Sequence, residues 1–339
     1  MKQMVIIAAG GAEKLQLRES ADANPTGRQL RIRVRAAGIN FADILARKGL
    51  YPDAPKLPAA VGYEVSGIVD AAGPEADRQW IGRKVLALTR FNGYADTVIV
   101  EDHQTFAMPE TLSFEQCAAI PVNYLTAWQL MVVMGSLSAD DTVLIHNAGS
   151  GVGLAAIDIG RHIGCRMIGT ASAGKHAFLK QRGLHEAIDY TRGDWFPELM
   201  RLTANRGVEL ILDPLGGSHW KKSYKALRHT GRLGMFGISS ATESSLPGPL
   251  KLVGMALGLP LFTPIGLMNE NRSVFGVNMG HLWHEPDKVA IWMQTILRGV
   301  AEGWVRPHVD KVFPLAQAGD AHSYIEARRN TGKVVLGVG

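Results

Sequence analysis

A glycine-rich turn between a buried strand and a helix constrains the fold of this chain more than any other feature. The apolar run Val143–His146 is followed by Asn147-Ala148-Gly149-Ser150-Gly151-Val152-Gly153, and helix-forming residues come next. The glycines permit a tight turn and let a diphosphate approach the backbone, while the helix N-terminus offers free N–H groups. We predict that the following residues bind the diphosphate of a dinucleotide: Gly149, Ser150, Gly151, Val152 and Gly153. The third glycine comes earlier than in G-x-G-x-x-G, so a plain strand-to-helix turn is the alternative.

The end of the next expected strand indicates which dinucleotide the turn would bind. An NAD site usually has Asp or Glu at this point, about 20 residues after the turn, to bind the ribose hydroxyls. Here the chain reads Gly169-Thr170-Ala171-Ser172-Ala173-Gly174-Lys175, with a serine and a lysine but no acid. We therefore predict NADPH, whose 2′-phosphate is an anion. The segment also resembles an ATPase phosphate loop, but His176 stands where a Ser or Thr should hold magnesium.

The order of the expected elements indicates two domains, which also suits a length of 339 residues. Roughly the first 120 residues read as short strands, among them Leu30–Arg35, Val65–Val69, Lys84–Leu88 and Thr97–Val100. From about residue 123 strands and helices alternate, which is typical of a parallel sheet with helices on both faces. The expected strands are Thr142–His146, Arg166–Thr170, Ala187–Asp189, Val208–Asp213, Arg232–Phe236 and Val274–Val277, and the expected helices are Val152–Ile163, Lys175–Arg182, a segment near 194–202, Ser218–Leu227 and Asp287–Ala301. The chain ends on a strand, Lys333–Gly337. We predict an α/β fold in which a doubly wound Rossmann sheet is inserted into a β-rich domain made from both chain ends.

The charge distribution argues against nucleic acid as a partner. The formal net charge of +5 is a mild basic bias, which suits an anionic small ligand. In the densest basic stretch, Arg31, Arg33 and Arg35 alternate with aliphatic residues, so one strand face would carry the arginines. No aromatic residues are interleaved to stack on bases. We interpret this stretch as a solvated strand face.

Three further features bear on compartment and membrane contact. The only cysteines, Cys117 and Cys165, lie in apolar surroundings, which favours a reducing, cytoplasmic compartment. The N-terminal apolar stretch is too short for a signal peptide and reads as a first strand. Residues 252–268 carry no charge, but they are shorter than the roughly 20 residues of a spanning helix and contain Pro260 and Pro264. We expect a loop and helix lining an apolar cleft, with peripheral membrane contact as the alternative.

Several motifs resemble the medium-chain dehydrogenase/reductase superfamily over essentially the whole chain. Besides the glycine turn and the segment 170–175, they are Ala37–Asp43, Gly49–Tyr51, Val122–Ala127, Ile188–Tyr190, Leu212–Gly217, Phe275–Gly276 and Pro307–Asp310. The similarity is closest to the quinone oxidoreductase branch and, within it, to the synaptic vesicle VAT-1-like proteins. This resemblance implies a GroES-like catalytic domain of residues 1–122 and 282–339 around a Rossmann NADPH-binding domain of residues 123–281.

The chain departs from the zinc enzymes of that superfamily at both metal sites. Asn40 stands where they have a ligand cysteine, and Tyr63 stands where they have a histidine. Their structural zinc needs four closely spaced cysteines, which this chain lacks. His281 and His284 have no partner pattern that completes a site. We therefore expect no metal.

The resemblance also implies candidate site residues. Asn40 and Tyr51 match positions near the substrate, and Tyr63 is a weaker candidate; each can donate a hydrogen bond to an enolate oxygen. Thr126 matches a residue beside the nicotinamide. Ser172, Lys175 and Tyr190 match the 2′-phosphate side. Further candidate cofactor contacts are Phe236, Phe275 and Asn330.

The expected function is NADPH-dependent transfer of a hydride to a quinone or an α,β-unsaturated carbonyl compound without zinc. The alternative is a VAT-1-like protein that binds NADPH but acts in membrane or lipid traffic with little catalysis. Relatives in the branch imply a homodimer through an edge strand of the cofactor domain, around Val274–Val277.

Overall fold

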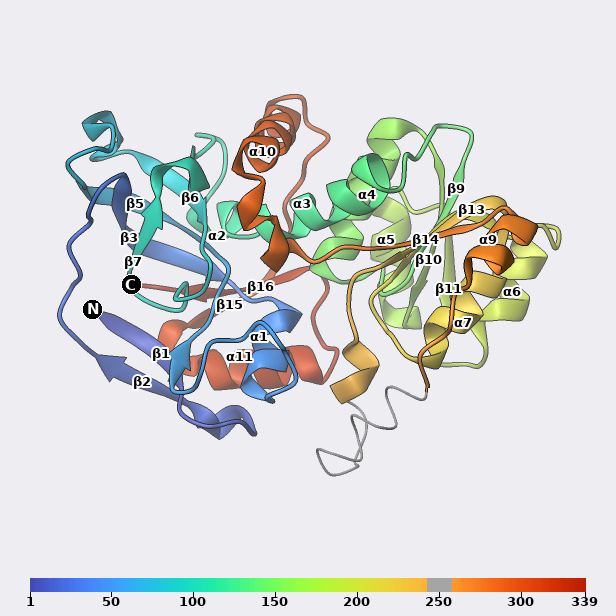
Figure 1. The fold of residues 1–339 in the computed structure, drawn as a ribbon, viewed down its shortest axis with the longest axis horizontal. Helices are drawn as coiled ribbons and strands as arrows, with labels where there is room; N and C mark the ends of the chain where they lie inside the picture. The colour runs from blue at the N-terminus through green and yellow to red at the C-terminus, as the bar shows by residue number, and fades with distance from the viewer. Residues whose placement is uncertain (243–257) are drawn as a thin grey trace. The chain divides into compact units, whose positions relative to one another are not determined.

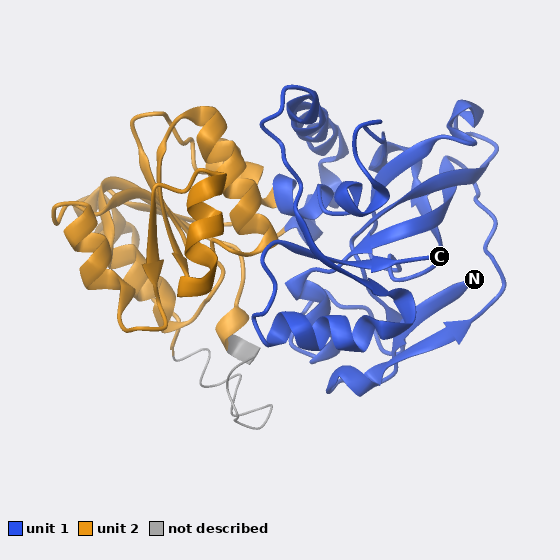
Figure 2. Cartoon of the chain, turned by 180° about the vertical axis from the view of Figure 1, so that it is seen from behind, with its two compact units in different colours: residues 1–125, 279–339 blue, residues 126–278 orange. Residues whose placement is uncertain are grey.

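The computed structural model describes residues 1–242 and 258–339 of the chain. The chain divides into two compact units (Figure 2). Unit 1 contains Met1–Leu125 and Met279–Gly339, and unit 2 contains Thr126–Asn278. Both chain ends therefore belong to the same unit, and the other unit is one continuous insertion.

Unit 2 is built on a six-stranded parallel sheet. Its strands are β9 (Thr142–Ile145), β10 (Arg166–Ala171), β11 (Glu186–Asp189), β12 (Val208–Asp213), β13 (Leu227–Met235) and β14 (Ser273–Gly276), in the spatial order β11-β10-β9-β12-β13-β14. This is the doubly wound Rossmann order: strands are added outward from β9 to β11, and the order of addition then reverses, so that β12 lies on the other side of β9. A ligand site is expected at that reversal, beyond the carboxyl ends of these two strands.

Helices cover both faces of this sheet. Figure 1 shows α4 (Gly151–Ile163) and α5 (His176–Arg182) on one side, and α6 (Trp195–Leu202), α7 (Ser218–Lys225) and α9 (Pro264–Glu270) on the other. The strands are almost continuously apolar because both faces of the sheet are covered. β12, for example, is buried along its whole length.

Unit 1 is mainly antiparallel. Its larger sheet runs β15 (Val309–Pro314), β16 (Lys333–Gly337), β3 (Gln29–Gly38), β5 (Glu64–Ala72), β6 (Lys84–Leu88) and β8 (Thr105–Ala107), with β7 (Thr97–Glu101) paired to β3. A smaller sheet contains β2 (Leu15–Glu19), β1 (Lys2–Ile6) and β4 (Ala59–Ala60). The helices are α1 (Phe41–Arg47), α2 (Phe114–Cys117), α3 (Pro121–Trp128, which runs into unit 2), α10 (Pro286–Ala301) and α11 (Ala318–Glu326).

The predicted fold class is confirmed: a Rossmann-type parallel sheet is inserted into a mainly antiparallel, β-rich unit made from both chain ends. Strands Lys84–Leu88, Val208–Asp213 and Lys333–Gly337 have the predicted bounds. One helix prediction was wrong at its end: Ser218–Leu227 stops at Lys225, and Leu227 starts β13. Ala226 and Leu227 are fully buried beside β12, so packing in the sheet outweighs the local helical pattern.

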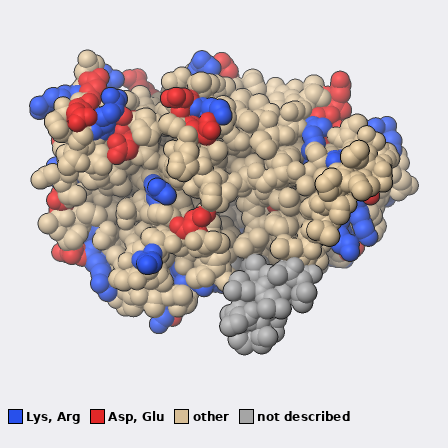
Figure 3. All heavy atoms as spheres, viewed as in Figure 1, with Lys and Arg blue, Asp and Glu red and all other residues tan. Residues whose placement is uncertain are grey.

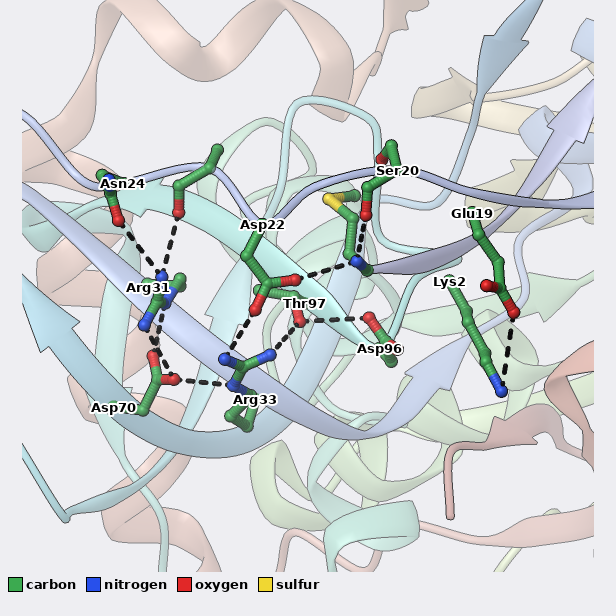
Figure 4. A network of polar contacts seen from close by, with 12 residues as sticks. Lys2, Glu19, Ser20, Asp22, Asn24, Arg31, Arg33, Asp70, Asp96 and Thr97 are labelled. Atoms are coloured by element: carbon green, nitrogen blue, oxygen red, sulfur yellow. Dashed lines mark hydrogen bonds and ion pairs between the residues drawn. The ribbon is translucent and has the colours of Figure 1, made fainter.

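The arginine stretch lies in β3 and is held by acidic partners. Arg31, Arg33 and the residues between them alternate in burial as predicted. Figure 4 shows that the carboxylate of Asp70 accepts hydrogen bonds from both guanidinium groups, and that Arg33 also forms an ion pair with Asp22 at 2.6 Å. On the molecular face drawn in Figure 3, basic and acidic side chains are interspersed. These contacts neutralise the arginines within the protein itself.

Part of the apolar segment 252–268 lies outside the described residues, which resume at Gly258. Within the described part, Pro264 begins α9 and Thr263 caps it, with its hydroxyl accepting a hydrogen bond from Gly266 N–H at 3.2 Å. Leu261, Ile265 and Met268 are 89%, 72% and 75% exposed, so they do not line a closed apolar cleft within unit 2. No helix among the described residues has the length and apolar character that crossing a bilayer requires.

Candidate cofactor and substrate sites

The glycine turn has the local geometry of a diphosphate cradle. Asn147 adopts a left-handed backbone with φ of 56°, which turns the chain from β9 toward α4. Ser150 caps α4, and its hydroxyl accepts a hydrogen bond from Gly153 N–H at 3.1 Å. A Cβ atom at Gly153 would lie 2.5 Å from the carbonyl oxygen of Ala148, so only glycine fits there. The first N–H groups of α4 have no partner within the helix and form an anion site.

Lys175 lies against this turn. A Cβ atom at Gly149 would stand 2.8 Å from Cδ of Lys175 and 3.7 Å from its Nζ atom. The lysine follows β10 and ends the short turn Ala173–Lys175, which Ser172 precedes. The structure thus brings the cation predicted for the 2′-phosphate next to the turn predicted for the diphosphate.

The other predicted cofactor residues of unit 2 lie on neighbouring elements. Tyr190 and Phe236 are the first residues after β11 and β13, at the carboxyl edge of the sheet. Phe275 lies in β14, and its ring packs so closely on Gly234 that a Cβ atom there would be 2.9 Å away. Thr126 is buried in α3. Asn330 belongs to unit 1, where its side chain donates to the Gly332 carbonyl at 2.8 Å, so the structure does not bring it to this edge within unit 2.

Behind the turn lies a buried group that has the composition of a metal site. The nearest ligand atoms of His146, Asp213 and His219 all lie within 4.8 Å of one another. Asp213 accepts hydrogen bonds from Ser223 Oγ at 2.6 Å and from His219 Nδ1 at 2.7 Å. Ser223 Oγ also lies 3.3 Å from His146 Nε2.

Hydrogen bonding fixes the protons of this group. Trp195 Nε1–H can only donate, and it donates to His219 Nε2 at 3.0 Å, so the proton of His219 is on Nδ1. Because Ser223 gives its proton to Asp213, its oxygen accepts the Nε2 proton of His146. A metal ion bound beside Asp213 would need a lone pair from each imidazole on that side. Neither imidazole has a lone pair in that direction. Hydrogen bonds satisfy the group as it stands, and burial lowers the pKa of His146 to about 3, which keeps it neutral.

On the substrate side, Asn40 is held by two charged groups. It precedes α1 and is nine-tenths buried. Its Nδ2 atom donates to Glu64 Oε1 at 2.9 Å, and its Oδ1 atom accepts from Lys333 Nζ at 2.7 Å. One amide N–H is thus already used inside the protein, which leaves the second N–H as the candidate donor to a substrate.

A second buried carboxylate fixes the backbone around Asn40. Asp43 accepts from the backbone N–H of Asn40 at 2.8 Å and of Gly62 at 3.0 Å, and from the hydroxyl of Tyr94 at 2.9 Å. Burial raises the pKa of Asp43 to about 6, although these hydrogen bonds oppose the rise. Asp43 therefore connects the residues before α1 to the residues before β5.

Tyr63 lies in an aromatic group with Tyr51 and Phe91. The Tyr51 and Tyr63 rings meet edge to face at 6.3 Å, and Phe91 lies 5.2 Å from Tyr63. The Tyr63 side chain is buried, and its hydroxyl forms no hydrogen bond of normal geometry with a described residue, although the Tyr51 hydroxyl interacts with it weakly. Burial, with the charge of Asp43 and the nearby Tyr51 adding to it, raises the pKa of Tyr63 well above its usual range. A buried hydroxyl without a partner is costly, and a bound carbonyl oxygen would satisfy it.

Comparisons with known proteins identify the family to which this fold belongs. A model of the alcohol dehydrogenase GroES-like domain matches residues 26–127, and a model described as a zinc-binding dehydrogenase matches residues 182–336. The human synaptic vesicle membrane protein VAT-1 homolog is 36% identical over 344 residues, which cover 99% of this chain and 86% of that protein. The chain belongs to the medium-chain dehydrogenase/reductase family.

Two solved structures of that family indicate different cofactors. Quinone oxidoreductase of Escherichia coli complexed with NADPH has a TM-score of 0.87 and 26% identity, and the match covers 99% of this chain and 100% of that one. A structure described as an NAD-dependent alcohol dehydrogenase has a TM-score of 0.84 and 32% identity, with complete coverage of both chains. The predicted resemblance to the quinone oxidoreductase branch and to VAT-1 proteins is confirmed.

Asn40 and Tyr63, which the sequence resemblance matches to zinc-ligand positions of related enzymes, are residues of other chemical types. Asn40 offers an amide and Tyr63 a phenol, neither of which is a usual zinc ligand. His281, which has no metal-site pattern in the sequence, pairs with Asp53 at 2.8 Å. The donors present at these positions suit a carbonyl oxygen better than a metal ion.

Sequence reasoning missed Glu64, Lys333 and Asp43. Glu64 and Lys333 both lie in strands. A charged residue on the buried face of a strand is the one sequence signal that could have indicated this pair. In Lys333-Val334-Val335-Leu336 the lysine opens an apolar run, so it reads as a strand end at the surface. The structure instead leaves it only 3% exposed.

Proposed function

We propose that this protein is an NADPH-dependent oxidoreductase that reduces a quinone or an α,β-unsaturated carbonyl compound without zinc. The observation that carries the proposal is the position of Lys175, whose side chain lies against Gly149 of the glycine turn. A cation at this place favours a dinucleotide with an additional phosphate, because charge-assisted hydrogen bonds to phosphate are strong. NADH is the competing cofactor.

The residues at the turn fit a dinucleotide. A side chain at position 153 would collide with Ala148, so glycine keeps the backbone accessible there, and the Ser150 hydroxyl caps α4 by accepting from Gly153 N–H. Ser172 and Tyr190 follow neighbouring strands and are candidate contacts to the 2′-phosphate side. Thr126, Phe236 and Phe275 are the candidate contacts around the nicotinamide.

When bound, NADPH supplies a hydride from C4 of its nicotinamide ring. The role of unit 1 in this proposal is to stabilise the negative charge that develops on the carbonyl oxygen of the substrate. Asn40 offers an amide N–H, and Tyr63 and Tyr51, whose rings lie edge to face, offer hydroxyl groups. Removing one such donor from a dry site typically costs about 3 kcal/mol of transition-state stabilisation. The planar rings of Tyr51, Tyr63 and Phe91 suit a flat conjugated substrate.

The test is a substrate panel. Purified protein is assayed with quinones and enones in the presence of either nicotinamide, and zinc is measured in the same sample. The proposal requires turnover with NADPH, a higher kcat/KM with NADPH than with NADH, and less than stoichiometric zinc. Turnover that depends on zinc, or a preference for NADH, contradicts it.

A lipid-surface role is the second candidate function, and the exposed side chains around α9 favour it. Leu261, Ile265 and Met268 are large, apolar and mostly exposed, and such groups often mark contact surfaces. Co-sedimentation with anionic liposomes would detect this role, and Ile265→Asp should abolish binding. Binding to liposomes without turnover on the substrate panel would favour the lipid role over the enzyme.

We also propose that two copies associate through β14. In the described sheet β14 pairs only with β13, so its other edge can pair with a second copy. Val274→Pro removes one N–H from this edge and should convert dimers to monomers in analytical ultracentrifugation. A monomeric wild-type protein would exclude this assembly.

The two cysteines fit the proposal of a reducing, cytoplasmic compartment. Cys117 and Cys165 are free and buried. Burial raises the pKa of their thiols to about 12 and about 11, so they are poor nucleophiles and oxidise slowly. Localisation of a tagged full-length protein would test the compartment.

A further inference from the structure

The Asn40 side chain forms hydrogen bonds with both members of a buried ion pair, Glu64 and Lys333, which lie far apart in the sequence. Lys333 lies 293 residues from Asn40 along the chain, yet its Nζ atom is 2.7 Å from Oδ1 of the asparagine. The antiparallel pairing of β16 with β3 explains the contact. Val335 lies opposite Gly38 and Leu336 opposite Ala37, and this register places Lys333 across from Asn40.

Glu64 completes the arrangement from β5. Its Oε1 atom accepts from Lys333 Nζ at 2.5 Å and from Asn40 Nδ2 at 2.9 Å, and its Oε2 atom accepts from Val122 N–H at 2.8 Å. Gly38 makes room for this carboxylate, because a Cβ atom there would lie 2.7 Å from Oε1. Glu64 and Lys333 are 0% and 3% exposed.

The chemistry of the two charged groups selects one orientation of the amide. An ammonium group can only donate and an ionised carboxylate can only accept. The Asn40 oxygen must therefore face Lys333, and its nitrogen must face Glu64. The reverse orientation would set N–H against ammonium and C=O against carboxylate. Since an amide is planar, fixing one N–H on Glu64 also fixes the direction of the other.

This ion pair is better understood as a device for orientation than for stability. Desolvation of two buried charges offsets most of their mutual attraction, so such pairs contribute little net stability. An asparagine between two neutral hydrogen-bonding groups could adopt both orientations, whereas a charge on each side excludes one of them.

We propose that Lys333 is a positioning residue that, together with Glu64, holds the Asn40 amide so that its second N–H is presented to the carbonyl oxygen of the substrate. The inference rests on the proposed function for its catalytic consequence. The orientation itself is a property of the protein without substrate, so it can be tested separately.

The first experiment observes the amide directly. The side-chain N–H₂ signals of Asn40 are identified in ¹⁵N-labelled full-length protein by their loss in Asn40→Asp. We expect them to be sharp and protected from exchange in the wild type. In Glu64→Gln/Lys333→Gln, which leaves no buried charge without a partner, they should broaden or lose protection. Unchanged signals in that variant would overturn the inference, whatever the enzyme activity.

The second experiment is a double-mutant cycle with Asn40→Ala. Glu64→Gln/Lys333→Gln should lower kcat/KM by about tenfold to hundredfold, because the donor is misplaced. Added to Asn40→Ala, the same changes should have no further effect, since Lys333 acts through Asn40. An equal loss in both backgrounds would show a merely structural role and contradict the inference.

A matched control comes from the buried Arg182–Asp158 pair of unit 2, whose atoms are 2.7 Å apart. Arg182→Gln/Asp158→Asn should leave the Asn40 signals unchanged, and any loss in kcat/KM should multiply with that of Asn40→Ala. If Glu64→Gln/Lys333→Gln does not fold, Lys333→Arg, which keeps a cation that only donates, is compared with Lys333→Gln. The Arg variant must retain the Asn40 signals and the Gln variant must lose them; identical behaviour of the two overturns the inference.

Discussion

At the scale of single residues, the proposed preference for NADPH over NADH depends on Lys175. Lys175→Ala should weaken NADPH binding by about tenfold or more, because a hydrogen bond to a charged group contributes about 1.5–3 kcal/mol. NADH has no 2′-phosphate, so its Kd should change little. Isothermal titration with both nicotinamides measures the difference. Lys180→Ala, which removes a more exposed lysine paired with Glu186, is the control. Equal losses for the two nicotinamides would contradict the assignment of Lys175.

Two of the buried tyrosines of unit 1, Tyr63 and Tyr94, should respond differently to loss of the hydroxyl. Tyr63→Phe removes a hydroxyl that forms no hydrogen bond of normal geometry and interacts only weakly with Tyr51, so the free energy of unfolding should change little while kcat/KM falls. Tyr94→Phe removes a hydroxyl bonded to Asp43 at 2.9 Å and lying 3.0 Å from His322 Nε2. It should therefore cost about 1–3 kcal/mol of stability. Urea denaturation compares the two variants, and a clear destabilisation by Tyr63→Phe would show that its hydroxyl has a structural partner.

At the scale of elements, two glycines of the turn before α4 should differ in how well they tolerate a side chain, because their surroundings differ. Gly153→Ala would press a Cβ atom against the backbone carbonyl of Ala148, so the turn must distort and both stability and cofactor affinity should fall. Gly149→Ala meets only the flexible side chain of Lys175, which can move away. It should preserve the melting temperature and weaken NADPH binding selectively. Thermal unfolding with and without NADPH measures both effects, and equal destabilisation by the two variants would contradict this account of the turn.

The sequence allowed prediction of those elements that local pattern determines. The parallel strands of unit 2 are apolar runs, and the turn before α4 has a glycine pattern, so both were predicted within a few residues. The short helix α1 was not predicted because its burial depends on segments far away in the chain. The strand β15 was not predicted because it is mostly exposed and is defined by its pairing with β16. Leu227 was assigned to a helix because its burial in β13 depends on packing beside β12.

The candidate site shows the same division. The glycine turn and Lys175 were predictable because a motif of a few residues specifies them. The contact of Lys333 with Asn40 and Glu64 was not, since it joins β16, β5 and the start of α1 and depends on strand register. The Tyr63 hydroxyl could be proposed from its sequence position, but its lack of a hydrogen bond of normal geometry is visible only in the folded chain.

At the scale of the whole molecule, buried histidines should make the fold sensitive to acid. Burial lowers the pKa of His146 and of His322 from 6.5 to about 3, so both are neutral in the fold and gain a proton on unfolding. The free energy of unfolding is therefore unaffected by these histidines above pH 6.5. It falls by several kcal/mol as the pH drops from 6.5 toward 3. Asp43 acts in the opposite sense: burial raises its pKa to about 6, so its contribution is largest below pH 3.8 and is lost as the pH rises through 6.

Urea unfolding between pH 7 and pH 4 tests this balance. His322→Gln should flatten the fall in the free energy of unfolding over that range. His281→Gln, at a histidine whose side chain is 64% exposed, is the matched control. A slope that is unchanged in His322→Gln would show that this histidine does not contribute to the acid sensitivity.

The central claim is that this chain transfers a hydride from NADPH to an electron-poor carbon without zinc. The most direct measurement uses an enone substrate and NADPH that carries deuterium at the C4 position from which the hydride is transferred. The metal content of the same preparation is also determined. The account predicts one deuterium at the β-carbon of the product, with zinc far below one equivalent and transfer unaffected by a chelator. Absence of deuterium from the product, or transfer that a chelator abolishes and zinc restores, would contradict it.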